Sequence, residues 1–365
     1  MTVRNVVTWC LVLVLAGLAL GVSLQADGRD LANPSAVPTR PETERRGCAP
    51  DASGTKAPLQ GIVTINAFPP GELDDFVGGR SVNVPWSVLQ PTEGGPLVQP
   101  NPIDDALAAV RAAGPAGSCA RGVKVRVLAG TSAPAWAKHL GGGPVPMTLT
   151  LDGLSGEVPR FWTPEFGAAY ANLQVLLADA YDDVPEIREV VISRCMTFYA
   201  EPLLRQPMDG RNAENLAAAG LDEEQDRACL TEQVDAHLVW RSTPSSLALN
   251  PYADLRGTRE PGGLDVPFTV ADHCRDVLGS RCILANNSVR WPGLTRQYAD
   301  LYLAMEHLGA PLEFQVAAPR RVGNVVEAVR WAILRGADNV EVEPSVVADA
   351  RTGLAALAAQ GWGPH

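Results

Sequence analysis

The sequence predicts a single-domain (β/α)8 TIM barrel, and two observations lead to this prediction. From residue 59 onward, short apolar runs alternate with longer amphipathic runs, which is the pattern of a parallel sheet covered by helices. Eight such units follow one another, as a closed barrel of this size requires. A doubly wound open sheet is the alternative, but INAFPPGELDD follows the first strand where that fold often carries G-x-G-x-x-G.

The strands are predicted from runs of β-branched, aromatic and leucine residues. They cover residues 61–68, 81–86, 123–130, 189–196, 246–250, 282–287, 312–318 and 339–344. The helices are predicted from apolar residues three or four positions apart, as at Ile103, Leu107 and Val110. They cover residues 102–114, 163–181, 230–240, 269–279, 295–309, 324–336 and 346–361.

The N-terminus carries an uncharged apolar segment, residues 6–24, directly after Arg4. Residues 1–26 are therefore predicted as a signal peptide or as a membrane anchor, since roughly 20 apolar residues span a bilayer. Both interpretations export the rest of the chain, secreted or anchored to the cytoplasmic membrane. Residues 27–57 are predicted as a disordered linker, because they are polar and proline-rich, and residues 58–365 as the barrel.

Cysteine usage agrees with an extracytoplasmic location, and the charge limits the partners. The formal net charge is −11, which excludes a nucleic-acid-binding surface, because phosphate contacts need clustered Lys and Arg. Six cysteines lie outside the apolar segment: Cys48, Cys119, Cys195, Cys229, Cys274 and Cys282. An even number in an exported chain indicates disulfides, and the short loop makes Cys274 with Cys282 the first candidate pair. Six buried, unpaired thiols are the alternative.

The predicted strands end in aromatic, amide and carboxylate side chains. In a (β/α)8 barrel these strand ends form the site. The candidates are Trp86, Trp136, Tyr199, Glu201, Asn250, Asn286, Gln315 and Glu343, with Glu313 and Glu341 earlier on their strands. Aromatic faces can stack on sugar rings, while amides and carboxylates bond hydroxyl groups. The set favours a neutral carbohydrate ligand. Because no zinc, P-loop or nucleophile-elbow motif is present, we expect neither a metal nor a cofactor.

Three passages carry a resemblance to a known family. VPWSVLQPTEGG (84–95), VKVRVLAGTSAPAW (123–136) and the passage 158–202 ending in FYAEP resemble the second to fourth units of clan A glycoside hydrolases, a superfamily of retaining cellulase-like and β-galactosidase-like barrels. The resemblance covers most of residues 59–362. It implies that Glu201, after the fourth strand, is the general acid/base. A raised pKa of this carboxyl would let it keep a proton to donate.

Two positions depart from the pattern that the resemblance implies. The clan usually has Asn before the acid/base residue, where this chain has Ala200. Its nucleophile is a Glu at the end of strand seven, and that position falls on Gln315, with Glu313 expected to lie too deep. A retaining mechanism needs two carboxylates about 5–5.5 Å apart, whereas an inverting one uses about 6.5–9.5 Å, which Glu343 could supply.

Each candidate also has a structural explanation. Glu201 could form an ion pair with Arg194 or Arg205, Glu343 could belong to a solvated strand end, and the two tryptophans could be rim packing. His139 is expected to be a surface or packing residue.

The sequence therefore predicts an exported glycoside-hydrolase-like barrel that acts on or binds carbohydrate, with Glu201 and Glu343 as candidate catalytic residues. Whether it is an enzyme stays open. The alternatives are a non-catalytic carbohydrate-binding barrel that lacks the nucleophile, and a cell-envelope interaction protein that uses the barrel as a scaffold.

Overall fold

Eight parallel strands of the described residues close into a barrel in the order β1-β10-β9-β8-β7-β6-β3-β2, which confirms the predicted fold. The computed structural model describes residues 50–114, 120–258, 263–292 and 296–361, all within the unit 38–365. The barrel strands are β1 (Gly61–Ile65), β2 (Val77–Pro85), β3 (Gly122–Leu128), β6 (Ile187–Val191), β7 (Ser245–Ala248), β8 (Cys282–Val289), β9 (Leu312–Val316) and β10 (Ala337–Val342).

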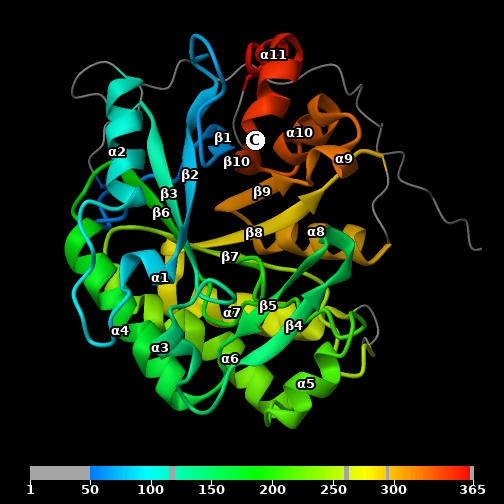
Figure 1. Cartoon of the computed structure of the whole chain (residues 1–365). Coiled ribbons are helices and arrows are strands. Elements are labelled where there is room, and N and C mark those ends of the chain that lie inside the picture. Colours follow the sequence, from blue (N-terminus) through cyan, green and yellow to red (C-terminus); the bar gives the residue numbers. More distant parts are fainter. Residues whose placement is uncertain (1–49, 115–119, 259–262, 293–295, 362–365) are drawn as a thin grey trace, which may run out of the picture. The chain divides into compact units, whose positions relative to one another are not determined.

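Helices surround these strands (Figure 1). The longer ones are α2 (Pro102–Ala112), α4 (Pro164–Tyr181), α5 (Asn212–Ala218), α6 (Glu223–Asp235), α7 (Asp265–Leu278), α8 (Arg296–Leu308), α10 (Val325–Ile333) and α11 (Pro344–Ala358). One-turn helices are α1 (Trp86–Leu89), α3 (Ala135–Lys138) and α9 (Pro319–Val322), and short 3₁₀ turns are η1 (Thr150–Asp152), η2 (Ala236–Val239) and η4 (Gly279–Arg281). Apolar faces of the helices and the strands form one continuous core.

Several element boundaries differ from the prediction. The strand predicted over 189–196 ends at Val191, and residues 192–205 form an irregular loop. Helix α6 begins at Glu223, seven residues before the predicted start, because Asp222 and Gln225 form a capping box there. It ends at Asp235, and η2 occupies the rest of the predicted helix.

A hairpin that the sequence did not predict follows β3. Strands β4 (Val145–Leu149) and β5 (Leu154–Val158) pair antiparallel, with η1 at the tip. On β4, Val145, Met147 and Leu149 are buried, so one face of the hairpin packs against the core.

Two disulfides are present among the described cysteines. Cys274–Cys282 joins the end of α7 to the start of β8, as predicted, and Cys195–Cys229 joins the loop after β6 to α6. Cys48 and Cys119 lie outside the described residues. The disulfides favour an oxidising compartment. Among the described residues no helix has the length and apolar character of a membrane span, and residues 6–24 lie outside them.

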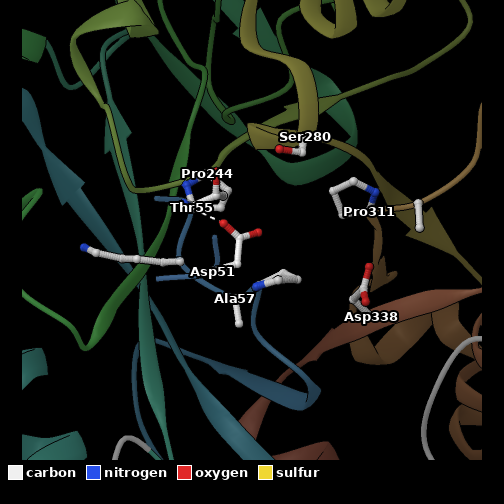
Figure 2. Close-up of a pocket in the computed structure, with 10 residues that line it drawn as sticks. Asp51, Thr55, Ala57, Pro244, Ser280, Pro311 and Asp338 are labelled. Carbon is white, nitrogen blue, oxygen red and sulfur yellow. Dashed lines mark hydrogen bonds between the residues drawn. The ribbon is translucent and has the colours of Figure 1, made fainter. Parts of the chain in front are cut away.

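The amino-terminal end of the barrel is covered by residues 50–58, so part of the predicted linker is ordered. Lys56 is buried, and its Nζ donates to the carbonyls of Val184 (2.8 Å) and Ile187 (2.9 Å) and to Thr243 Oγ1 (2.8 Å). Beside it lies a cavity of about 670 Å³, lined in part by residues just before β7, β8 and β9 and by Asp338 at the start of β10 (Figure 2). This cavity is at the opposite end of the barrel from Glu201.

The barrel interior holds a buried ion cluster. Neighbouring strands place Lys124 beside Ser81, and Glu313 beside Asn339. Lys124 Nζ contacts Glu313, Glu341 Oε1 (2.6 Å) and Glu189 Oε1 (3.1 Å), and all four side chains are almost fully buried. The cluster therefore occupies space that branched apolar side chains fill in most barrels of this class.

Burial and neighbouring charges set the protonation of the cluster. Burial and the charge of Glu313 raise the pKa of Glu189 well above its usual range, despite Lys124. Burial acts in the same direction on Glu341, but Arg126 and Lys124 outweigh it and lower that pKa to about 2. The same buried environment therefore shifts the pKa values of Glu189 and Glu341 in opposite directions.

We predict that Lys124→Met destabilises the protein by about 3–5 kcal/mol, because breaking a buried ion pair leaves uncompensated buried charge. Chemical denaturation measures the free energy of unfolding. The control is Arg111→Met, which removes a partly exposed ion pair with Glu186 and should cost less than about 1 kcal/mol. A loss from Lys124→Met no greater than that of the control would contradict the role of the cluster.

Peptide mapping of the unreduced protein should recover the crosslinked pairs Cys195–Cys229 and Cys274–Cys282. Both pairs have the Cα–Cα separations of disulfides, 6.1 and 5.8 Å. The measurement is mass spectrometry after alkylation of free thiols, with a pre-reduced sample as the control. Alkylated Cys195 or Cys274 in the unreduced sample would contradict the pairing.

Candidate functional site

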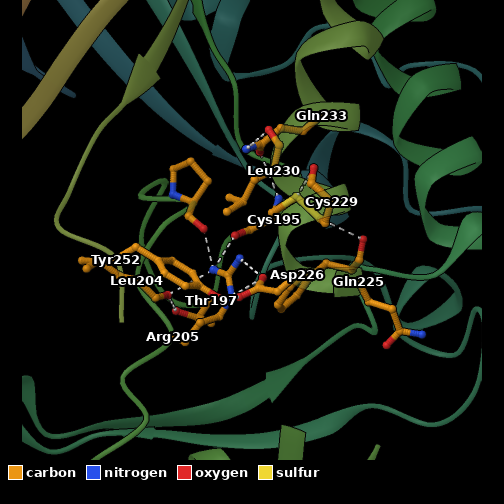
Figure 3. Close-up of polar contacts among 12 residues, drawn as sticks. Cys195, Thr197, Leu204, Arg205, Gln225, Asp226, Cys229, Leu230, Gln233 and Tyr252 are labelled. Atoms are coloured by element: carbon orange, nitrogen blue, oxygen red, sulfur yellow. Dashed lines mark hydrogen bonds and ion pairs between the residues drawn. A yellow bond between two sulfur atoms is a disulfide. The ribbon is translucent and has the colours of Figure 1, made fainter. Parts of the chain in front are cut away.

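The loop that carries Glu201 is fixed to α6 at both of its ends. The disulfide Cys195–Cys229 attaches its beginning, and a buried ion pair between Arg205 and Asp226 attaches its end (Figure 3). Glu201 lies between these two attachments. We infer that its position above β6 is set by rigid covalent and ionic contacts.

Arg205 organises the second attachment. Its Nε and Nη2 donate to Asp226 Oδ1 (2.9 and 2.6 Å), and its Nη1 donates to the carbonyl of Cys195 (2.9 Å). The guanidinium lies 4.7 Å from the ring centre of Phe161, and Tyr252 donates to the other oxygen of Asp226 (3.0 Å). Arg205 and Asp226 are buried, and their charges are satisfied by each other, by the Cys195 carbonyl on Arg205 and by the Tyr252 hydroxyl on Asp226.

The loop also touches the chain after β3, backbone against backbone. Thr131 N donates to the carbonyl of Thr197 (3.0 Å). A Cβ at position 130 would collide with that same carbonyl oxygen, so only glycine fits there.

Glu201 is not a structural ion pair with Arg194 or Arg205, which corrects that alternative. Arg194 pairs with Glu232 (2.9 Å) and Arg205 with Asp226. The carboxyl of Glu201 instead accepts a hydrogen bond from Asn250 Nδ2 (3.3 Å). Burial raises the pKa of Glu201 to about 7, although Asn250, Arg126 and Arg321 each oppose the shift. Because these three residues come from β3, from after β7 and from after β9, Glu201 faces the interior of the mouth.

Asn250 and Asn286 orient Glu201 from below. Asn250 Oδ1 accepts from Tyr298 (3.2 Å) and lies 3.5 Å from Asn286 Nδ2, while Asn286 Oδ1 accepts from Tyr302 (2.7 Å). Both asparagines are fully buried and fully engaged. Asn250 follows the end of β7 as predicted, whereas Asn286 lies inside β8, three residues before its end, and neither side chain is exposed to a ligand. Their place in this network fixes which way the Asn250 amide points.

The two predicted tryptophans differ in exposure. Trp86 is 0% exposed, and its ring packs edge-on against Trp136, Phe166 and Tyr170. Ligand stacking on Trp86 is therefore corrected to a core role. Trp136 is half-buried and donates from Nε1 to the Gln90 carbonyl (3.1 Å), so part of its ring remains open to a ligand.

Tyr199 is 42% exposed and donates its hydroxyl to Asp152 Oδ2 (3.1 Å), at the tip of the hairpin. Burial, with Asp152 as hydrogen-bond acceptor, raises its pKa. The exposed ring beside Glu201 is available for contact with a ligand.

The end of β9 carries an amide where the resemblance expects a nucleophile. Gln315 Oε1 lies 3.4 Å from Arg126 Nη2, and Arg126 also donates to Asn83 Oδ1 (3.0 Å) and Glu341 Oε1 (2.7 Å). Glu313 is deep in the barrel against Lys124, as the sequence analysis expected.

Glu343 lies directly after β10, as the residue before the first turn of α11. It is half-buried, and burial together with the charge of Glu341 raises its pKa. No hydrogen bond to its carboxyl is found among the described residues.

Sequence reasoning missed Arg126, Arg321 and Tyr298, all of which bear on Glu201. A signal for Arg126 was present. Lys124 and Arg126 alternate with valines in a strand of a chain that has only three lysines, so two charges had to point into the barrel. Arg321 and Tyr298 follow or precede strands in helical segments, where no spacing marks them. Among the described residues no cluster of His, Cys, Asp and Glu could hold a metal ion.

We predict that Glu201→Gln becomes more stable relative to wild type as the pH rises from about 5 to 8. Below the usual glutamate pKa, folded and unfolded chains are both protonated. As the pH rises toward 7, only the unfolded chain ionises, so wild-type stability falls, whereas the amide does not titrate. Thermal unfolding at both pH values measures the difference.

The control for this comparison is Glu93→Gln, which removes one exposed carboxylate that is distant from Glu201 in the sequence. A difference between Glu201→Gln and wild type that stays constant with pH, or that matches the control, would contradict a raised pKa at Glu201.

Comparison with known proteins finds likeness only among solved structures. No family model matches the sequence, and no curated protein matches it. Similar structures are endo-glycoceramidase II from Rhodococcus sp. (16% identity, 80% of this chain and 74% of that chain, TM-score 0.46), a β-galactosidase from the psychrophilic Marinomonas ef1 (11%, 77% and 53%, 0.43) and the mannanase catalytic domain from Streptomyces sp. SirexAA-E (12%, 84% and 84%, 0.39). The solved neighbours are thus clan A glycoside hydrolases, the group that the sequence resembles. At these identities and TM-scores, no argument about ligand or chemistry rests on them.

Proposed function

We propose that this chain is a carbohydrate-binding barrel with a glycoside-hydrolase-like mouth that has kept the acid Glu201 and lost the nucleophile. The observation that carries the proposal is Gln315 at the inward end of β9, 3.4 Å from Arg126. An amide can bond a sugar hydroxyl, but it lacks the charge that attacks an anomeric carbon and stabilises an oxocarbenium-like transition state.

The neighbouring carboxylates do not replace the missing nucleophile. Glu341 is held by Lys124, Arg126 and Ser81 (3.2 Å), and its low pKa reflects those contacts. Glu313 is sealed below it. Both therefore serve the barrel interior and are closed to a ligand.

The remaining mouth suits a polyol. Glu201 holds its proton near neutral pH and can donate it to a hydroxyl or glycosidic oxygen. Gln315 offers an amide, and Tyr199 and Trp136 offer partly exposed aromatic faces. Export belongs to the same proposal, and the two disulfides favour it.

An inverting hydrolase is the second candidate, favoured by Glu343. This carboxyl is half-buried beside the mouth strand β10 and accepts no hydrogen bond among the described residues. The pKa of Glu343 is raised toward neutral pH relative to an ordinary glutamate, which suits a general base. In this candidate Glu201 is the acid, and Glu343 activates a water molecule.

We predict that wild type binds sugars without turning them over, and that Gln315→Glu creates measurable hydrolysis with retention. Arg126 would hold the new carboxylate in place beside the mouth. The assay is hydrolysis of a panel of aryl glycosides, with product stereochemistry followed by NMR. The double variant Gln315→Glu/Glu201→Gln is the control and should lose about 10²–10⁴-fold of the gained rate.

The same panel separates the second candidate. Robust wild-type turnover that Glu343→Gln abolishes would replace the binding proposal by the inverting one. Turnover that survives both Glu343→Gln and Glu201→Gln would contradict both mechanisms, and absence of any sugar binding would contradict the proposed function.

A further inference from the structure

The β4–β5 hairpin connects opposite sides of the barrel mouth. It belongs to the segment between β3 and α4, and in the barrel order β3 and β9 stand four strands apart in a ring of eight. Yet Asp152, in the turn at the hairpin tip, contacts Arg320 and Arg321 of α9, directly after β9. The tip therefore lies on the opposite side of the mouth from β3, the strand that precedes the hairpin.

The tip is held at the far rim by several contacts. Arg321 Nη2 pairs with Asp152 Oδ1 (2.6 Å), Arg320 pairs with the same oxygen, and Tyr199 donates to Oδ2 (3.1 Å). Asp152 is mostly covered, with 16% of its side chain exposed. Tyr199 stands two residues before Glu201 in the same loop, so the anchored tip lies beside the segment that carries the proposed acid.

Strand β4 is also fixed along its length, from Pro146 near the base to Thr148 near the tip. Asn212 of α5 exchanges two hydrogen bonds with the backbone of Thr148 (2.8 and 2.7 Å), and Asn215 donates to the carbonyl of Pro146 (2.9 Å). The face that carries Met147 and Leu149 is buried in the core. A strand pair fixed at both ends and along one face is a permanent part of the mouth.

We infer that this hairpin makes the site specific for the ends of carbohydrate chains. A polysaccharide bound along its middle must leave the mouth on both sides of the acid. Because the hairpin is anchored on opposite sides of the mouth beside Glu201, a bound chain can leave the mouth on one side only. The site then takes a terminal sugar or a short oligosaccharide. This inference rests on the proposed function and adds the substrate class to it.

Equilibrium binding as a function of chain length tests the inference. The probes are β-linked gluco-, galacto- and manno-oligosaccharides of two to four units and the soluble polymer of the same linkage. If ends are bound, affinity per chain end is constant, and affinity per sugar unit falls about 25- to 50-fold from the oligosaccharides to a polymer of about a hundred units. Constant affinity per sugar unit would overturn the inference while leaving the proposed function intact.

A variant supplies the second arm of the experiment. Val145 and Val158 face each other at the base of the hairpin, so residues 146–157 can be replaced by an Asn-Gly turn. This shortened chain should bind internal segments and regain the polymer's affinity per sugar unit. The control, Glu157→Gln on the exposed face of β5, should keep the wild-type length dependence.

The outcomes are distinguishable. A folded, shortened variant that still prefers ends would overturn the inference, and if that variant does not fold, the wild-type length dependence still decides it. A wild type that binds no member of the panel would overturn the proposed function and this inference with it.

Discussion

The contacts of the Lys124 ammonium with three buried glutamates are the interaction on which the Arg126 and Gln315 side of the barrel mouth depends. A barrel of this class normally fills its interior with branched apolar side chains. Here the interior is polar, so its geometry is set by charge pairing, which is directional and intolerant of a missing partner. Glu341 contacts both Lys124 and Arg126. Arg126 in turn contacts Gln315 at the mouth, so the ion pairs also constrain the position of Gln315.

The acid is positioned independently of that cluster. Its loop has no regular secondary structure, yet the disulfide to Cys229 and the buried pair of Arg205 with Asp226 hold it to one helix. The amide of Asn250 reaches it from the next strand. Glu201 can therefore be buried enough to retain its proton without relying on a neighbouring carboxylate. The proposed function needs this property, because in it the acid acts without a second carboxylate.

The sequence was sufficient for the fold and for the order of its strands, because the alternation of strands and helices is a local pattern. It was insufficient for side chains that are buried by elements distant in the sequence. Ile192 and Met196 look like strand residues, but they lie in the irregular loop after β6 and are buried there. Trp86 follows β2 as predicted, whereas Asn286 lies inside β8, and Tyr170 and Tyr302 from helices cover the two side chains. The hairpin was missed because its glycines and prolines are typical of a loop, and its order comes from packing against α5 and the core.

The glycine at position 130 has a consequence for how such a mouth can change through descent. The backbone after β3, which leads into the hairpin, rests directly on the backbone of the loop that bears the acid. No side chain lies between them to absorb an adjustment. Related chains with a longer or shorter hairpin must therefore differ beyond this contact. The length of the hairpin can then change while the position of Glu201 stays the same.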